Sequence, residues 1–197
     1  MELICTLTSP YARRVRVLAH ELGIKDQLKI QVVKPRESSD FLWTINPMGK
    51  VPTLRLDDGS SIYDSLTICD YLIATFSPEW GIKQQISYWD YRTRLSMLNE
   101  MSDAGTQARR LKNQDPPQQN AASFQFDKIH RGLTHIEDTW ITLESDLSMT
   151  SIGLGCTFDW FLNRFPEIKW TVSYPGITSW FNEFKLRESM ENSQIPS

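Results

Sequence analysis

The stretch "ELICTLTSPYARRVRVLAHELG" (residues 2–23) decides the fold class of this chain. Residues 2–7 are rich in branched side chains, which predicts a short β-strand. Ser9 and Pro10 then take the N-cap and first position of a helix, whose apolar side chains recur at helical spacing. Gly23 stands where glycine commonly ends a helix. A strand followed directly by a helix indicates the start of an α/β domain.

The segments that follow extend this start into a small sheet. Residues 29–33 (KIQVV) predict a second strand, and residues 38–45 (SSDFLWTI) predict a short helix. Residues 53–64 (TLRLDDGSSIYD) predict a hairpin with an Asp-Gly turn, and a further helix begins at Ser65. The order β-α-β-α-β-β-α predicts a mixed sheet with helices on its faces.

After residue 76 the strand patterns end, and helical patterns follow over about 82–112, 126–147, 149–162 and 175–184. The third of these is apolar nearly all round, which predicts the central helix of a bundle. We therefore expect a domain over residues 1–76, a linker over 77–84 and an all-helical domain over 85–197. The polar end of the chain, from about Ser189, is expected to be loosely held.

Composition excludes several classes of function. The net charge of −3 is small and spread along the chain, so we expect neither nucleic acid nor membrane as a partner. Cys5, Cys69 and Cys156 are far apart in apolar stretches, which predicts no metal site and no disulfide framework. The N-terminus shows no signal segment and no uncharged run could span a bilayer, so a reducing, cytoplasmic compartment is expected.

Residues 46–54 (NPMGKVPTL) carry the most specific functional signal. Pro52 directly precedes a strand, where proline is rarely tolerated, and a cis Val51-Pro52 bond is one reason for its presence. Val51 would then offer its N–H and C=O to an extended ligand, as an edge strand pairs with a peptide. Gly49 would allow that backbone to approach closely.

Residues 63–72 (YDSLTICDYL) predict a site for an amino-acid head group. Ser65 is expected to cap a helix whose first-turn N–H groups attract a carboxylate, and Asp64 could hold an ammonium group. Ser9 completes the pattern, since a thiol above a helix N-terminus is favoured as thiolate. A pair such as Ser9-Pro10 is by itself more often only a cap. Together the three stretches predict a ligand with an amino-acid head, a peptide-like middle and a thiol.

These stretches, with "LSMTSIGLGCTFDWFLNRFPEIKW" (147–170), resemble the cytosolic glutathione S-transferases, particularly bacterial forms with a reactive serine. The resemblance covers essentially the whole chain. It implies a thioredoxin-like domain followed by a helical bundle, with glutathione as co-substrate and no metal. It further implies a small electrophilic substrate, a homodimer and a role in detoxification.

The resemblance also implies roles for single positions. Ser9 matches the residue that stabilises the thiolate, and Val51 matches the residue whose backbone pairs with the cysteinyl part of glutathione. Lys50 precedes Val51 in the same loop, and Asp64 and Ser65 match the acidic-Ser pair that holds the γ-glutamyl end. The remaining assignments are Lys34 for the glycine carboxylate, and Tyr11, Asp103 and Gln107 for the second-substrate pocket.

Other residues have simpler interpretations. For Asp103 and Gln107, which share a helical face, a solvated polar surface is the alternative. The arginines at 13, 14 and 16 are expected on the helix surface, with one of them pairing across the domain interface. Ser151 stands where family members commonly carry the Asp of a capping box, which predicts a weaker cap.

The sequence thus predicts a glutathione S-transferase in which glutathione thiolate attacks an electrophilic carbon. One alternative is another glutathione-dependent activity, such as a peroxidase, isomerase or dehalogenase. The other is a non-enzymatic binding protein of the same fold. The joint presence of Ser9, Val51, Asp64 and Ser65 favours an enzyme, while the electrophile is not encoded in any motif.

Overall fold

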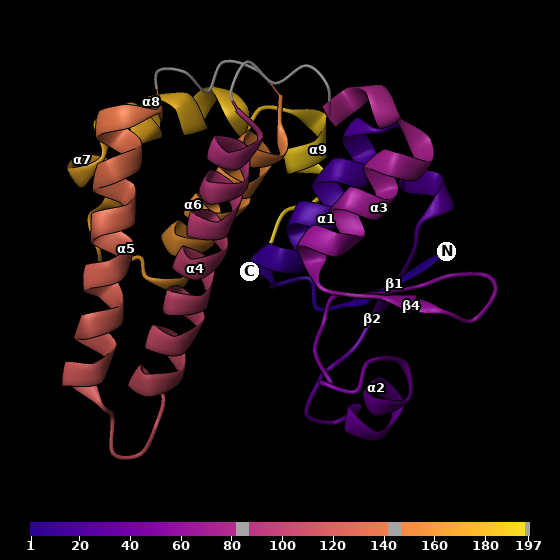
Figure 1. The fold of residues 1–197 in the computed structure, drawn as a ribbon. Coiled ribbons are helices and arrows are strands. Elements are labelled where there is room, and N and C mark those ends of the chain that lie inside the picture. The colour runs from indigo at the N-terminus through magenta and orange to yellow at the C-terminus, as the bar shows by residue number, and fades with distance from the viewer. Residues whose placement is uncertain (82–86, 142–146, 196–197) are drawn as a thin grey trace. The chain divides into compact units, whose positions relative to one another are not determined.

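The computed structural model describes residues 1–81, 87–141 and 147–195, which fall into two compact units (Figure 1). The first unit spans Met1–Gln84 and takes in the segment from Glu188 onward, and the second spans Gln85–Arg187. The end of the chain therefore groups with the first unit, whereas the sequence placed it in the helical domain.

A four-stranded mixed sheet of order β2-β1-β3-β4 lies at the centre of the first unit. β1 (Glu2–Cys5) runs parallel to β2 (Lys29–Val32) and antiparallel to β3 (Thr53–Arg55), which pairs with β4 (Ser61–Ile62). The helices of this unit are α1 (Pro10–Glu21), α2 (Ser39–Ile45), α3 (Ser65–Phe76) and α9 (Glu188–Glu191), with 3-10 turns η1 (Lys25–Gln27) and η2 (Pro78–Gly81). The predicted thioredoxin-like domain is confirmed.

The second unit is helical, as predicted. Its elements are α4 (Tyr88–Lys112), α5 (Gln119–Thr139), α6 (Met149–Arg164), α7 (Trp170–Ser173) and α8 (Pro175–Phe184). Nearly every residue of α6 is buried, which confirms it as the central helix. The pattern expected to run to residue 147 ends as a helix at Thr139, and residues 142–146 lie outside the described part. Residues 82–86 of the expected 82–112 helix also lie outside it.

α6 begins with a capping box made of two serines. The Ser148 hydroxyl accepts from the Ser151 N–H at 3.0 Å, and the Ser151 hydroxyl accepts from the Ser148 N–H at 2.8 Å. A serine at the third position therefore forms both reciprocal contacts.

In the part of the chain described, no helix combines the length and apolar character needed to cross a membrane.

Two of the three arginines of α1 are buried and Arg16 is half-buried, contrary to the expectation of surface charges. Arg13 is 2% exposed and Arg14 is fully buried. Arg13 donates to the Ser193 hydroxyl at 3.3 Å and to the Met190 carbonyl at 3.1 Å, while Arg16 donates to the Ser193 carbonyl. The prediction of a loosely held C-terminal segment is therefore wrong, because α1 supplies buried donors to its backbone carbonyls.

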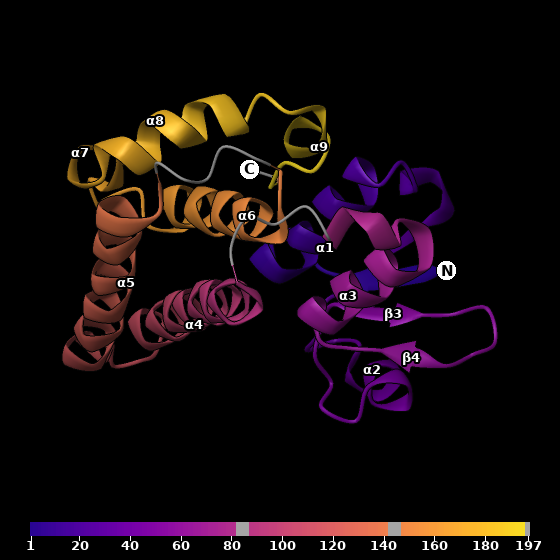
Figure 2. The same ribbon diagram turned by 45° about the horizontal axis from the view of Figure 1, so that its top comes forward.

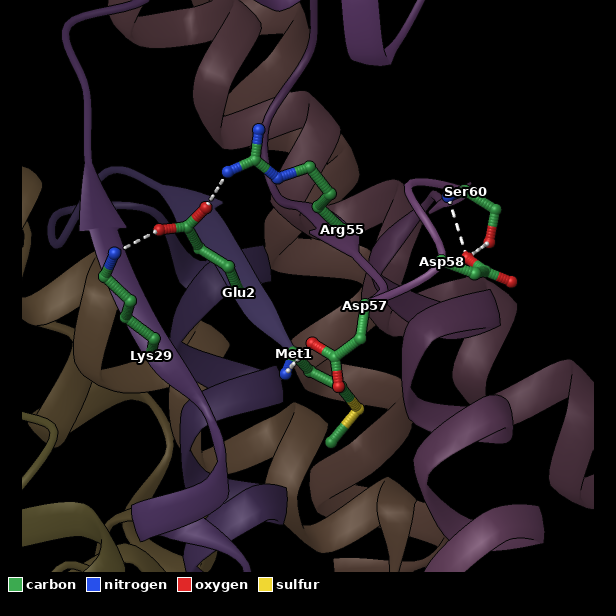
Figure 3. A network of polar contacts seen from close by, with 7 residues as sticks. All are labelled: Met1, Glu2, Lys29, Arg55, Asp57, Asp58 and Ser60. Carbon is green, nitrogen blue, oxygen red and sulfur yellow. Dashed lines mark hydrogen bonds and ion pairs between the residues drawn. The ribbon is translucent and has the colours of Figure 1, made fainter.

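Glu2 joins three strands of the sheet through its carboxylate (Figure 3). One oxygen lies 3.0 Å from the Lys29 ammonium on β2, and the other pairs with the Arg55 guanidinium on β3. The hydrogen bond from Lys29, assisted by Arg55, holds the pKa of Glu2 below its ordinary value, and burial opposes this only in part. Next to this group, the Met1 ammonium lies 3.0 Å from Asp57.

Replacing Glu2 by glutamine should lower the free energy of unfolding by about 1–2 kcal/mol, because a neutral amide binds two cations less strongly. Thermal unfolding followed by circular dichroism would show this as a Tm lower by a few degrees. Because the pKa of Glu2 is lower in the folded protein than its ordinary value of 4.5, the stabilisation by Glu2 is complete above pH 4.5. It is lost as the pH falls through the pKa that Glu2 has in the folded protein. The Tm difference between wild type and Glu2→Gln should therefore shrink in acid.

Asp26→Asn is the matched control, since it removes the same charge from an exposed position on η1. An equal loss of stability in both variants would show that net charge, rather than the Glu2 contacts, is responsible.

Candidate functional site

Strand register brings the three candidate stretches to one end of the sheet. In the β1–β3 pair Ile4 lies opposite Thr53, and in the β3–β4 pair Leu54 lies opposite Ile62. Because both pairs are antiparallel, the end of β1, the start of β3 and the end of β4 lie at the same edge. Figure 2 shows the β3–β4 turn at the opposite end from the start of α3.

The candidate residues leave the sheet at this edge. Ser9 follows the end of β1, Val51 precedes the start of β3, and Asp64 and Ser65 follow the end of β4. All four belong to the first unit, so a single sheet positions them. The pairing pattern thus assembles stretches that are far apart in the sequence.

Ser9 is the N-cap of α1, as predicted. Its hydroxyl oxygen accepts a hydrogen bond from the Ala12 N–H at 3.2 Å, and the side chain is half-buried. A serine hydroxyl carries one donor hydrogen and two acceptor lone pairs. The capping contact uses a lone pair, and the described residues show no acceptor for the hydrogen. Ser9 can therefore cap the helix and still donate to a ligand.

The Val51-Pro52 bond is cis, as the sequence predicted, and Gly49 adopts a φ of +60°. In the part of the chain described, neither the N–H nor the C=O of Val51 has a hydrogen-bond partner, whereas the Lys50 carbonyl accepts two hydrogen bonds. The Lys50 side chain is exposed. The loop thus leaves one residue, Val51, with a backbone free for an extended ligand.

Asp64, and not Ser65, caps α3, which corrects the sequence prediction. One Asp64 carboxylate oxygen accepts from the Leu66 N–H at 3.1 Å and from the Thr67 N–H at 3.3 Å. Ser65 is the first residue of the helix and is 2% exposed, while Asp64 is exposed and follows a second cis bond, Tyr63-Asp64. Two of the N–H groups assigned to a ligand carboxylate are therefore already occupied.

Lys34 leaves the sheet at this same edge, because it follows the end of β2, which runs parallel to β1 with Val32 opposite Cys5. Lys34 is exposed and its ammonium lies 3.2 Å from Glu37. Tyr11 is half-buried in the first unit, whereas Asp103 and Gln107 are exposed on α4 of the second. These three residues belong to two separate units, and the second-substrate pocket stays a prediction.

The cysteines do not add a reactive thiol to the site. All three lie within the described residues and are buried rather than joined in a disulfide. Burial raises the pKa of the Cys5 thiol, with the Arg16 charge opposing it, so this thiol is a packing residue. Among the described side chains, no group of three or more His, Cys, Asp or Glu is placed to hold a metal ion.

The first unit also has a hollow of about 440 Å³, which is separate from the candidate site residues. Its lining includes Arg16, His20, Lys25 and Val32 but none of the candidate site residues. Its cations already have partners, since Arg16 donates to the Ser193 carbonyl and Lys25 lies 3.6 Å from Glu188. It therefore does not belong to the candidate site.

Asn46 and Thr53 flank the Val51 loop, and the sequence does not predict a role for either residue. Asn46 is 2% exposed and Thr53 is fully buried, and both bind the Lys50 carbonyl. Both residues stand in the NPMGKVPTL stretch, seven positions apart, but no local pattern shows that their side chains meet.

Comparisons with known proteins find similarity in both units. Residues 3–80 match the family model for the N-terminal domain of glutathione S-transferase, and residues 105–183 match that for the C-terminal domain. The chain is 25% identical to the "Uncharacterized GST-like protein YibF" of Escherichia coli (strain K12), over 100% of this chain and 99% of that protein.

Two solved structures extend the comparison. A glutathione transferase family member from Pseudomonas fluorescens Pf-5, crystallised with bound glutathione, has a TM-score of 0.91 and 29% identity, covering 100% of this chain and 99% of that one. A glutathione S-transferase from Methylobacillus flagellatus KT with glutathione bound has a TM-score of 0.88 and 25% identity, covering 99% of each chain.

Replacing Asp64 by alanine should lower the free energy of unfolding by about 1 kcal/mol, because α3 loses its N-cap acceptor. Asp64→Asn keeps an acceptor oxygen and should remain close to wild type. Urea denaturation measured by tryptophan fluorescence checks both values. Equal stability of the alanine variant and wild type would contradict the capping role of Asp64.

Proposed function

We propose, for a chain that belongs to the glutathione S-transferase family, that its first unit binds glutathione and that it catalyses conjugation to a small electrophile. The observation that carries the proposal is the sheet edge where a helix-capping hydroxyl, an unpaired Val51 backbone and an acidic N-cap lie together. These three groups correspond to the thiol, the peptide-like middle and the amino-acid head of glutathione.

The head group would bind at the start of α3. The second oxygen of the Asp64 carboxylate is available for the γ-glutamyl ammonium, because the capping contacts use only the first oxygen. The Ser65 N–H and hydroxyl would receive the carboxylate, at a helix end whose partial charge is positive. In this arrangement Asp64 caps the helix and binds the ligand with different atoms.

The middle of the tripeptide would pair with Val51. Its N–H and C=O would meet the cysteinyl C=O and N–H in the manner of two strands. Lys50 and Lys34 would approach the glycine carboxylate as exposed cations. Pairing with the backbone fixes the direction of the ligand, and this places its thiol toward the end of β1.

The thiol would meet Ser9 at the N-terminus of α1. The Ser9 O–H donates to the sulfur and the helix dipole adds positive potential, and both lower the thiol pKa. The proton leaves to solvent, the thiolate forms a carbon–sulfur bond, and the leaving group departs with its electron pair. Ser9 forms no covalent bond in this scheme. The residues assigned to the second substrate are Tyr11 on the first unit and Asp103 and Gln107 on the second.

We further propose that the protein is a serine-type member of its family. We also propose that it forms a homodimer, is cytoplasmic and acts in detoxification. The hydroxyl at Ser9 supports the serine-type assignment, and the other three assignments rest on the family membership.

Ser9→Ala should leave the glutathione dissociation constant within about threefold of wild type and lower kcat by at least about tenfold, because the bound thiol pKa rises toward the free value of about 8.5. Thiolate absorbance of the complex against pH gives the pKa, and conjugation of an activated aryl halide gives the rate. Ser9→Thr, which keeps the hydroxyl, is the control. An unchanged thiol pKa in Ser9→Ala would exclude this role.

Asp64→Asn and Ser65→Ala should each weaken glutathione binding by about tenfold, since each removes one charged or polar contact to the head group. Isothermal titration calorimetry measures the affinity. Asp64→Asn is informative because it preserves the cap, and Asp26→Asn controls for the lost charge. Wild-type affinity in both head-group variants would overturn the assignment, and wild type that binds no glutathione would overturn the proposed function.

A further inference from the structure

The loop before β3 is closed by hydrogen bonds between two buried side chains and one carbonyl. The Asn46 amide nitrogen donates to the Lys50 carbonyl at 3.1 Å and to the Thr53 hydroxyl at 3.2 Å. Thr53 donates to the same Lys50 carbonyl at 2.9 Å, and the Asn46 side-chain oxygen accepts from the Met48 N–H at 3.0 Å. Every polar atom of both side chains is therefore used inside the loop.

This closure sets the direction of the Val51 N–H. The Lys50 carbonyl and the Val51 N–H belong to one planar peptide unit, in which they point in opposite directions. Two hydrogen bonds from Asn46 and Thr53 hold the carbonyl toward the buried side of the loop. The Val51 N–H must therefore point away from them, and the described residues provide no partner for it.

α2 restrains the other side of the same loop. Gly49 has a φ of +60°, and a β-carbon there would lie 2.9 Å from the indole nitrogen of Trp43. A larger residue would be strained by the backbone and would also collide with Trp43. Trp43 of α2 thus lies close against the turn at Gly49, while buried side chains hold the Lys50 carbonyl.

From this arrangement we infer that Asn46 and Thr53 are positioning residues that orient the Lys50–Val51 peptide, and so preorganise Val51 to pair with the backbone of a peptide-like ligand. The inference rests on the proposed function, which supplies glutathione as that ligand. Neither side chain needs to touch the ligand, because both act through the Lys50 carbonyl. A preorganised loop binds more tightly since less conformational freedom is lost on binding.

Paired substitutions at Thr53 test the inference. Thr53→Val removes the hydroxyl with little change in shape, and Thr53→Ser keeps it. We expect the valine variant to raise the dissociation constant of glutathione by about tenfold, with kcat at saturating glutathione within about twofold of wild type. The serine variant should bind like wild type. Asn46→Asp, which loses both donated hydrogen bonds and keeps the Met48 contact, should behave like Thr53→Val.

Thr157→Val in the second unit is the matched control for stability. The Thr157 hydroxyl is buried and lies 3.0 Å from the Ser102 hydroxyl on α4, so its loss removes one buried hydrogen bond, whereas loss of the Thr53 hydroxyl removes two. This variant should lower Tm as Thr53→Val does while glutathione affinity stays at the wild-type value. Equal affinity of Thr53→Val and Thr53→Ser, or equal weakening by Thr157→Val, would overturn the positioning role.

Amide hydrogen exchange without glutathione separates this inference from the proposed function. Thr53→Val should speed exchange of the Met48 and Gly49 N–H groups, which are hydrogen-bonded within the loop, relative to both wild type and Thr157→Val, because the loop opens more often. If wild type binds no glutathione, the proposed function fails, and faster exchange still supports the orienting role within the loop. Unchanged exchange in Thr53→Val would overturn that role whether or not glutathione binds.

Discussion

The antiparallel pairing of β1 with β3 is the constraint on which the candidate site depends. Ile4 lies opposite Thr53, so the chain leaving β1 toward Ser9 and the chain entering β3 from Val51 meet at one edge. β4 extends the same register and brings Asp64 to that edge. A slip of one residue would turn every side chain of β3 to the other face and move Thr53 out of its buried position.

Helix capping and ligand binding share the same residues at this edge. Ser9 and Asp64 both accept hydrogen bonds from the first turns of α1 and α3, and both keep further atoms for other partners. A helix N-terminus needs an acceptor and also attracts negative charge. The residue types that start a helix are therefore suited to a thiolate or a carboxylate ligand, and structural and functional interpretations of Ser9 are compatible.

The candidate site could be predicted from the sequence where a residue acts through its own local backbone. The Ser9 cap and the cis Val51-Pro52 bond follow from proline chemistry and helix starts, and both were predicted. The cap of α3 was assigned one residue too late, since Asp64 and Ser65 are both good N-caps and no local pattern separates them. Asn46 was not identified, because its partners depend on how the loop closes.

Sequence pattern alone predicts the order of strands and helices along the chain, the change from a sheet to a helical unit, and the helix that is apolar nearly all round. These follow from periodicities and turn residues, which act over a few positions of the chain. The burial of Arg13 against the segment after Glu188, and the joining of three strands by Glu2, follow instead from contacts between distant parts of the folded chain. Arg13 is buried where distant residues supply its hydrogen-bond acceptors, and periodicity carries no information about contacts between residues so far apart.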